Sequence, residues 1–533
     1  MTIASDRASA SVEATGAVRA SGASAERARP YAYYALVVLT CAGLLNYADR
    51  NVLSILAESI KADLELSDQQ LGFLYGTAFA VFFAVVGIPM GRLADAMSRK
   101  FLMATGLTLW STMTAASGFA GSFGHLAAAR VGVGLGEATA NPCSHSMIAD
   151  YFPKRSRATA LAVYLVGTTL GTATALGVGG LVLQHWPSAC GSVGVAGACD
   201  VASWQIAFFV VGAPGLIVAL LVAFLREPPR AAAWRKAPIA ALIFREFSAT
   251  VPPLTLLALG REAGARGVLK NLALASAIVA LAVGLGLATH DWPQWIAVGI
   301  GAYSIGSWAQ ILRMRDRPMF ALTLGCPTFL LALFGMAIIG CLNGIFHFWA
   351  APHAIRTLGM SASAVGAAIG AATVVGSIIG IMAGGVITDW WKLRDPRAPF
   401  WMALIALLAQ IPAVAIMFLT EDPTVFVAAF FIQVLICQCW AGGAAALAQD
   451  LVLPRMRGTG SACFSLIIII ITLAMGPYWS GKISTLSGSL TLGVLSGLAL
   501  VPVSVVCLVI GAQRMRRETE EARWARARAH GEP

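Results

Sequence analysis

The feature that most constrains this chain of 533 residues is its series of apolar segments, each about as long as a membrane-crossing helix. A helix needs about 20 predominantly apolar residues to cross the hydrocarbon core of a bilayer. Six such segments lie in the first half, six in the second and two between them, so fourteen spans are expected. The segments lie near residues 33–57, 70–92, 101–121, 124–150, 157–184, 205–225, 269–289, 295–312, 319–350, 363–389, 400–420, 424–449, 459–482 and 489–512.

The composition excludes a soluble globular protein. Hydrophobic residues make up 58% of the chain and charged residues only 12%, whereas soluble domains carry about 25% charged residues. Because backbone N–H and C=O groups find no water inside a bilayer, helices must satisfy them internally. The sequence therefore predicts an all-α polytopic membrane protein.

Basic residues set the expected orientation, because short cytoplasmic loops retain Lys and Arg. Only Lys61, Arg356 and Lys482 fall on the predicted outer side, and only Arg50 and Arg130 fall within spans. All the other Lys and Arg residues fall on the opposite side. We therefore expect a multi-pass protein of the bacterial inner membrane with both termini in the cytoplasm.

The two ends of the chain give no sign of another class. The first 30 residues contain no apolar run, so they are not a secretory signal peptide, and their polar composition predicts a disordered tail. The net charge of +11 follows from the orientation and the anionic inner leaflet. The basic tail has no aromatic interleaving beyond Trp524, so nucleic acid is not expected as a partner.

Internal repetition predicts two six-helix halves. Arg157 and Arg457 stand 300 residues apart in the similar stretches DYFPKRSRATA and DLVLPRMRGTG. Repeated halves are typical of transporters that rock around a substrate site at the membrane midplane. The expected organisation is a tail at 1–30, a first half at 31–226, a central loop with an inserted hairpin at 227–317, a second half at 318–513 and a basic tail at 514–533.

The inserted hairpin consists of the segments at 269–289 and 295–312. Each is about long enough to cross the core, and basic residues flank both at the cytoplasmic side. The dipeptide His290–Asp291 would then form a tight outer turn. The alternative is a pair of helices that lie along the inner surface of the membrane.

A loop motif, G-x-x-x-D-x-x-x-R-K, occurs in the first half and is echoed in the second. It resembles the signature of the major facilitator superfamily. The resemblance implies a cytoplasmic gate, in which the glycine permits close helix approach and the aspartate pairs with basic groups and a helix end. Ala96 and Ser98 depart from the usual pattern, which has Arg and Gly there. The motif positions are Gly91, Asp95, Arg99 and Lys100, and then Gly385, Asp389, Lys392 and Arg394.

Further segments resemble the spinster-like branch of that superfamily. The resemblance covers about residues 33–225 well and the second half more loosely. It implies proton-linked movement of an amphipathic lipid, such as a lysophospholipid or sphingosine phosphate. Organic-anion symporters share the N-Y-x-D-R motif, whereas the G-x-G-E-A run favours spinster. The segments are NYADR at 46–50, RVGVGLGEA at 130–138, ADYFP at 149–153 and WAAPxxxRxxG at 349–359.

Ionisable residues inside the apolar segments are the first candidates for a functional site, because charges at membrane depth are rare unless they serve transport. At about 1.5 Å per residue, Asp49, Arg130 and Glu137 lie about 20–30 Å from the cytoplasmic ends of their helices. Arg130 and Glu137 are two turns apart and share a face. We expect these three residues to couple protons to transport, and Arg50 and Arg130 to bind an anionic substrate. The alternative is a static ion-pair network between the first and fourth spans.

Other polar and aromatic side chains are expected to line the substrate site. Asn141 and His145 lie one and two turns beyond Glu137, on roughly the same face of the helix. The alternatives are a structural hydrogen-bonding role for the histidines and contact with lipid headgroups for the aromatic residues. The residues are Asn141, His145, His347, Trp349 and Tyr478.

The ten cysteines indicate no metal or redox centre. Eight lie in apolar segments, where a thiol behaves as a small hydrophobe. Cys190 and Cys199 share a predicted outer loop, and we expect a disulfide between them in an oxidising periplasm. Because no metal-ligating, phosphate-binding or nucleophile motif occurs, we expect neither an enzyme nor a cofactor.

Together these features predict a secondary active transporter that uses alternating access and the proton gradient. The expected substrate is an amphipathic or anionic small molecule such as a lysolipid. Protons and membrane lipids are the other expected partners, and the protein is expected to be a monomer. One alternative is an organic-anion symporter in which Arg50 or Arg130 binds a carboxylate. Another is a receptor or sensor on a transporter scaffold, although neither tail is long enough for an appended folded domain.

Overall fold

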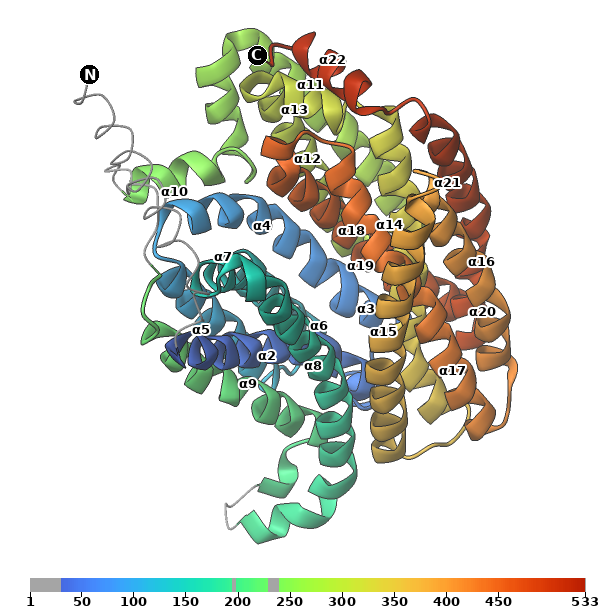
Figure 1. Ribbon diagram of the computed structural model, residues 1–533. Helices are drawn as coiled ribbons and strands as arrows, with labels where there is room; N and C mark the ends of the chain where they lie inside the picture. The colour runs from blue at the N-terminus through green and yellow to red at the C-terminus, as the bar shows by residue number, and fades with distance from the viewer. Residues whose placement is uncertain (1–29, 194–197, 229–238, 533) are drawn as a thin grey trace, which may run out of the picture.

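The computed structural model describes residues 30–193, 198–228 and 239–532, and the regular elements in these ranges are all helical (Figure 1). The predicted all-α fold class is confirmed. The predicted N-terminal tail lies outside the described residues up to position 29, and so does the part of the central loop at 229–238.

The first half contains six helical segments at the predicted places. The second is continuous but includes a π-helical turn, and the fourth is broken after Glu137. The helices are α2 (Pro30–Asp63), α3 (Asp68–Gly72), η1 (Phe73–Thr77), α4 (Ala78–Ala96), α5 (Arg99–Ser117), α6 (Phe123–Glu137), α7 (Ala140–Tyr151), α8 (Lys154–Ala189) and α9 (Ser203–Ala223).

The second half repeats this plan, including the broken fourth segment. The break after Glu137 recurs after Cys437, 300 residues later, which is the interval of the sequence repeat. The helices are α14 (Pro327–Arg356), α15 (Ala362–Lys392), α16 (Ala398–Leu419), α17 (Pro423–Cys437), η4 (Gln438–Trp440), α18 (Ala441–Asp450), η5 (Pro454–Met456), α19 (Arg457–Ser487), α20 (Leu490–Leu495), η6 (Ser496–Leu500) and α21 (Val501–Met515).

The three basic residues predicted outside do lie together at one end of the molecule. Lys61 and Arg356 both contact Asp68. Lys482 pairs with Asp291, which also contacts Gln69, the residue that follows Asp68. This end is called the outer end, and the opposite end, where α5 begins, the inner end.

The helices that follow short loops at the outer end begin at polar capping residues. Each cap accepts a hydrogen bond from a backbone N–H that has no partner within its helix. The capping residues are Ser67, Ser122, Ser361, Asp422 and Ser489.

The two halves form separate groups, blue to green and yellow to red, that meet at three main places (Figure 1). These are α2 against α14, the continuous run of α3, η1 and α4 against α19, and α8 against α15. At the α3 seam a Cβ on Gly72 would come within 2.2 Å of the backbone oxygen of Pro477. Only glycine fits there, so the seam is packed backbone to backbone.

The two inserted segments form an antiparallel helical hairpin. It consists of α11 (Thr255–Thr289) and α12 (Trp292–Arg315). The first begins earlier than the predicted residue 269 and is broken at Gly264, whose φ of 61° is open to glycine. The remaining short helices are η2 (Cys190–Val193), η3 (Ala198–Asp200), α10 (Ile239–Phe247), α13 (Arg317–Leu322) and α22 (Glu520–Arg528).

The turn of the hairpin is fixed at the outer end. Asp291 is buried, accepts a hydrogen bond from Tyr478 (2.6 Å), pairs with Lys482 (2.8 Å) and contacts Gln69. One turn further, Gln294 donates to the backbone oxygen of Ala474 at 3.0 Å. Since α12 reaches the outer end from the inner end, its geometry favours a hairpin that crosses the membrane over one that lies along the inner surface.

The number of spans remains a prediction. Among the described residues, twelve helical runs have the length and hydropathy to cross a membrane. The predicted segments at 101–121 and 124–150 are helical but are not among the twelve. Both are rich in polar residues, and the second holds Arg130 and Glu137.

We predict that the turn of the hairpin is accessible from outside. His290 is exposed beside the buried Asp291, so a cysteine introduced at His290 should react with an impermeant thiol reagent in right-side-out vesicles. Cysteines at Glu421, in an outer loop, and at Arg516, beyond α21, are matched controls for the two sides. The hairpin model is wrong if His290→Cys reacts only after permeabilisation, as Arg516→Cys should.

Candidate functional site

Four charged residues lie buried together between α2 and α6. Asp49 and Arg50 come from α2, and Arg130 and Glu137 from α6. None is more than 8% exposed. Nη2 of Arg50 lies 2.8 Å from Oε2 of Glu137, so these two residues form the ion pair of the cluster. The structure thus brings together all four ionisable residues that the sequence placed at similar depth.

Arg130 holds the backbone rather than a carboxylate. Its guanidinium donates to the backbone oxygen of Asp49 at 3.1 Å and to that of Leu74 at 3.3 Å. Leu74 lies in the π-helix η1, where altered backbone bonding is often found at functional sites. Arg130 therefore ties α6 to both α2 and η1.

The carboxylate of Asp49 has no hydrogen-bond partner of standard geometry. Trp110 and Thr114 of α5 lie beside it, and their donor groups are likewise buried and unpartnered. A buried polar group without a partner is destabilising. A carboxyl group destabilises the fold more when it is ionised than when it is protonated. A protonated Asp49 would therefore be less unfavourable to bury than an ionised one.

Aromatic rings surround the Arg50 guanidinium. Its central carbon lies 4.6 Å from the ring centre of Phe79, 5.0 Å from that of Tyr47 and 5.2 Å from that of Phe83. Such contacts stabilise a desolvated cation by about 0.5–2 kcal/mol each. Phe83 also lines the main cavity, so one ring separates the ion pair from open space.

The main cavity lies between α4, α7, α12 and α19 and has a volume of about 700 Å³. It runs from Phe83 and Ala138, next to the charged cluster, to Arg92 and Gly458 at the inner end. Most of its wall is apolar. Two of the predicted site residues, Asn141 and His145, line it.

The inserted hairpin supplies part of this cavity wall. Ser304, Ile305 and Trp308 of α12 line it. The Ser304 hydroxyl and the Trp308 indole N–H are buried without a protein partner. The sequence analysis missed these residues because it placed the hairpin outside the two halves, although a polar pair one turn apart in an apolar span was a usable signal.

The other predicted lining residues do not reach this cavity. His347 packs against Phe430, with ring centres 5.5 Å apart. Trp349 is fully buried, and Tyr478 is bonded to Asp291 at the hairpin turn. The structure therefore brings Asn141 and His145 to the cavity but not His347, Trp349 or Tyr478.

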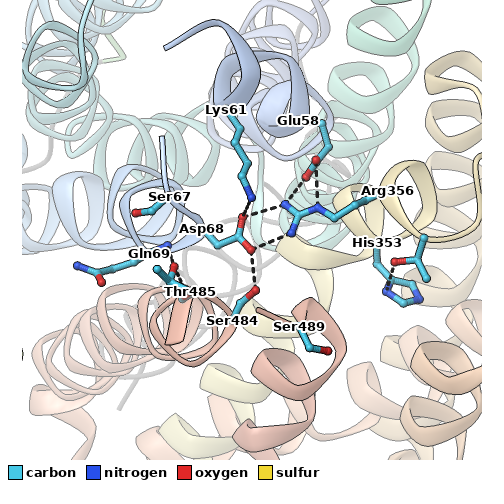
Figure 2. Close-up of polar contacts among 12 residues, drawn as sticks. Glu58, Lys61, Ser67, Asp68, Gln69, His353, Arg356, Ser484, Thr485 and Ser489 are labelled. Atoms are coloured by element: carbon cyan, nitrogen blue, oxygen red, sulfur yellow. Dashed lines mark hydrogen bonds and ion pairs between the residues drawn. The ribbon is translucent and has the colours of Figure 1, made fainter. Parts of the chain in front are cut away.

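A second polar cluster closes the outer end of the molecule (Figure 2). Arg356 of α14 donates to both carboxylate oxygens of Asp68 at 2.8 Å and to both of Glu58 at 2.7 and 3.1 Å. Asp68 also accepts from Lys61 at 2.5 Å and from Ser484 at 2.6 Å. Because Arg356 and Ser484 belong to the second half and the others to the first, this outer cluster holds the halves together there.

The sequence analysis assigned Arg356 to the outer side but did not predict this cluster. Glu58 and Asp68 are acids at the ends of spans and face Arg356 across almost 300 residues of sequence. Their position beside the few outer basic residues was the available signal.

At the inner end, the basic residue of each gate motif pairs with an acid in its own half. Arg99 lies 2.5 Å from Asp150 and 2.9 Å from Glu227, and Lys392 pairs with Asp450. The backbone N–H of Lys100 also donates to Glu227. Burial alone would raise the pKa of Glu227, but the hydrogen bonds from Arg99 and its neighbours outweigh it and hold the pKa below its ordinary value.

The expected close helix approach at Gly91 is wrong for this conformation, because a Cβ added there would meet nothing within 4 Å. At Gly385 an added Cβ would also meet nothing, but a Cβ on Gly442 of α18 would come within 3.5 Å of the Cα of Gly385, so α15 and α18 approach closely there. Gly91 lines the open cavity, so no helix of the second half lies against it. The side chain of Asp95 lies outside the described part of the structure. Within that part, Asp389 forms no ion pair, and Arg394 lies 4.0 Å over the ring of Trp390.

The predicted cysteine pair is joined in the structure. Cys190 and Cys199 form a disulfide in the outer loop between α8 and α9. The described residues of this loop do not line the cavity or join the buried charged cluster.

The sequence of this chain is similar to those of known transport proteins. Residues 39–462 match the family model for the Major Facilitator Superfamily. An MFS-type efflux pump from Mycolicibacterium smegmatis is 30% identical over 500 residues, which cover 92% of this chain and 95% of that protein. A hexuronate transporter from Bacillus subtilis is 30% identical over 196 residues, which cover 37% of this chain and 42% of that protein.

A solved structure resembles the whole chain. It is the crystal structure of a bacterial homolog to the human lysosomal transporter Spinster, in an inward-facing and occupied conformation. The TM-score is 0.67 at 25% identity, over 93% of this chain and 99% of that one. The cavity open towards the inner end and the closed outer cluster are consistent with the same conformational class.

We predict that Arg356→Ala opens the outer end. The substitution removes the residue that joins Asp68 and Glu58 to the second half, and the loss of such charge-assisted bonds is worth roughly 1–3 kcal/mol. A shift of that size changes the ratio of conformations by about five-fold to 150-fold. Spin labels at Ala62 and Leu486, exposed at outer ends of the two halves, should show a longer distance by pulsed electron spin resonance. Arg356→Lys keeps the positive charge but lacks the planar guanidinium, so its distance between the labels should fall between those of the parent and of Arg356→Ala. An unchanged distance in Arg356→Ala would refute the outer gate.

Proposed function

The chain belongs to the major facilitator superfamily, in its spinster-like branch, and we propose that it is a proton-coupled transporter for an amphipathic anion such as a lysolipid. The proposal places it in the bacterial inner membrane with both termini in the cytoplasm. We further propose that it works as a monomer.

The observation that carries the proposal is the buried ion pair of Arg50 and Glu137 behind Phe83. A substrate phosphate or carboxylate that reached Arg50 would compete with Glu137 for the same guanidinium. A Glu137 side chain that lost this partner would be a buried, unpaired carboxylate, which protonation neutralises. Binding of the anion and binding of a proton therefore favour each other.

Asp49 and Arg130 extend the same coupling. Asp49 lies next to Arg50 in the chain, and its unpartnered carboxylate offers a second place for the proton. Arg130 fixes the backbone of Asp49 and so sets the position of this acid relative to α6. In this proposal Arg130 is a positioning residue, and Arg50 is the residue that meets the substrate.

The cavity supports an amphipathic substrate. Its walls are mostly apolar, whereas Arg92, Asn141 and His145 add polar groups. Apolar pockets with a few placed polar groups are the usual form of small-molecule sites. The resemblance to the spinster-like branch implies a lipid-like substrate, and the likeness to the structure of a spinster homolog adds to that resemblance.

A second candidate is an organic-anion symporter. The buried Arg50 is also suited to a carboxylate, and the hexuronate transporter of Bacillus subtilis matches part of this chain. Proteoliposomes with an imposed pH gradient separate the two: uptake or exchange of lysophosphatidylglycerol but not of glucuronate supports the first candidate, and the reverse result supports the second.

We predict that Glu137→Gln abolishes accumulation driven by the pH gradient but retains downhill exchange of the transported substrate. Gln is nearly isosteric, so Arg50 keeps a hydrogen-bond acceptor while the titratable group is lost. Asp49→Asn should have the same effect if the two acids share one proton and a weaker one otherwise. Arg50→Ala should lose both activities. Normal gradient-driven accumulation by Glu137→Gln, at matched expression in vesicles, would return the cluster to a static structural role.

We also predict that a bulky side chain on the hairpin blocks the cavity. Ile305 of α12 lines it, whereas Ile296 of the same helix is 56% exposed on the surface. Ile305→Trp should reduce transport by at least about ten-fold because it fills the cavity. Ile296→Trp makes the same chemical change outside the cavity and should leave transport within about two-fold. Equal rates for the two variants would show that α12 does not line the transport path.

A further inference from the structure

A basic cleft lies at the inner end of the hairpin, away from the main cavity. The helices α11, α12, α13 and α22 contribute to its wall, and its volume is about 940 Å³. Among the described residues that line it, Glu262 is the only acid. The residues of the cleft with basic side chains are Arg266, Lys270, Arg313, Arg317, Arg526 and His530.

Most of this charge is uncompensated. Glu262 accepts from Nε of Arg315 at 2.8 Å, and Arg526 pairs with Glu518 at 3.1 Å. The four other Lys and Arg residues of the cleft have no acidic partner in the part of the chain that the structure describes. Like charges gathered in a concave site repel one another, so an anion there is stabilising. The four residues are Arg266, Lys270, Arg313 and Arg317.

The cleft lies at the level of lipid headgroups. Lys270 precedes His290 at the hairpin turn by twenty residues, and about 1.5 Å per residue gives roughly 30 Å, the thickness of the hydrocarbon core. Leu269 and Leu272, beside Lys270 on α11, are 69% and 45% exposed. An acyl chain that descended from the cleft would meet these apolar side chains.

We propose that this cleft binds the headgroup of an anionic phospholipid of the inner leaflet. The planar guanidinium groups of the arginines donate paired hydrogen bonds to phosphate oxygens, and the ammonium group of Lys270 adds a positive charge. Four unpaired cations exceed the charge of one phosphate, so a lipid with two phosphates binds more tightly than a lipid with one. The site is separate from the transport cavity, and the proposal does not depend on the substrate.

Such a lipid would also fix the C-terminal helix. Arg526 of α22 and His530, just beyond its end, line the cleft whose other walls are α11, α12 and α13. A bound headgroup would therefore connect the tail to the hairpin. Without the lipid, repulsion between the cleft cations and Arg526 weakens this contact.

Native mass spectrometry of the purified full chain tests the site. The probes are tetraoleoyl cardiolipin, dioleoyl phosphatidylglycerol, dioleoyl phosphatidylethanolamine and soluble glycerol 3-phosphate. We expect affinity to fall in that order. The triple variant Arg266→Gln, Lys270→Gln, Arg313→Gln should bind cardiolipin at least about ten-fold more weakly than the parent. The control removes three exposed basic residues at the inner end outside the cleft, Arg514, Arg516 and Arg517, and should change affinity by less than about two-fold.

A second variant keeps every basic residue and so preserves the charges that orient the hairpin. Gln310 lines the cleft and accepts a hydrogen bond from Asn271, which Glu can also accept. Gln310→Glu should weaken cardiolipin binding by about three-fold or more. Gln513→Glu adds the same charge on the exposed face of α21 and should not.

Three results would overturn the proposal. Equal losses in the cleft triple and the tail triple would indicate general surface attraction. Equal binding of cardiolipin and phosphatidylethanolamine would remove the role of charge. Displacement of cardiolipin by glycerol 3-phosphate at comparable concentration would show a site for free phosphate instead of a lipid.

Discussion

The buried pair of Arg50 and Glu137 is the interaction around which the first half is built. Two arginines and two carboxylates lie between α2 and α6, where transfer of even one unpaired charge from water is strongly unfavourable. Arg50, Arg130 and Glu137 are tolerated because each faces an opposite charge, a backbone oxygen or an aromatic ring, whereas the carboxylate of Asp49 has no hydrogen-bond partner of standard geometry. Arg130 of α6 donates hydrogen bonds to the backbone of α2 and η1. These bonds fix α2, which carries Asp49, against α6, which carries Glu137. The conformations of α2, α6 and η1 therefore depend on one another.

The closed outer end and the open inner cavity follow from how the polar contacts are distributed. At the outer end, Arg356 and Ser484 of the second half bond to Asp68 of the first. At the inner end, Arg99 and Lys392 bond to acids within their own halves. Contacts within a half do not resist its rotation, whereas contacts between halves do. The conformation is thus held by the outer cluster, and the open space beside Gly91 results from it.

The sequence was sufficient to predict the all-α class, the helix positions and the depth of the charged residues. Apolar runs and the positive-inside bias act locally, so they can be read from a window of residues. Depth along a helix could be counted, and it correctly placed Asp49, Arg130 and Glu137 together. Counting gives no direction around the bundle axis, however. This is why the partner of Glu137 proved to be Arg50, and why Tyr478 faces the hairpin turn instead of the cavity.

The hairpin was predicted as a separate insertion, yet its contacts join it to both halves. At the outer end Asp291 is bonded to Tyr478 and Lys482 of the second half and contacts Gln69 of the first.

If the halves separate at the outer end, the hairpin must leave one of them. Gln294 is subject to the same constraint, because it accepts from Thr77 of the first half and donates to Ala474 of the second. Each hydrogen bond of this kind contributes about 0.5–1.5 kcal/mol, and more when a charge takes part. The hairpin therefore adds to the stability of the outer-closed state. Because α12 also walls the cavity, the same helix can link the occupancy of the cavity to the state of the outer gate.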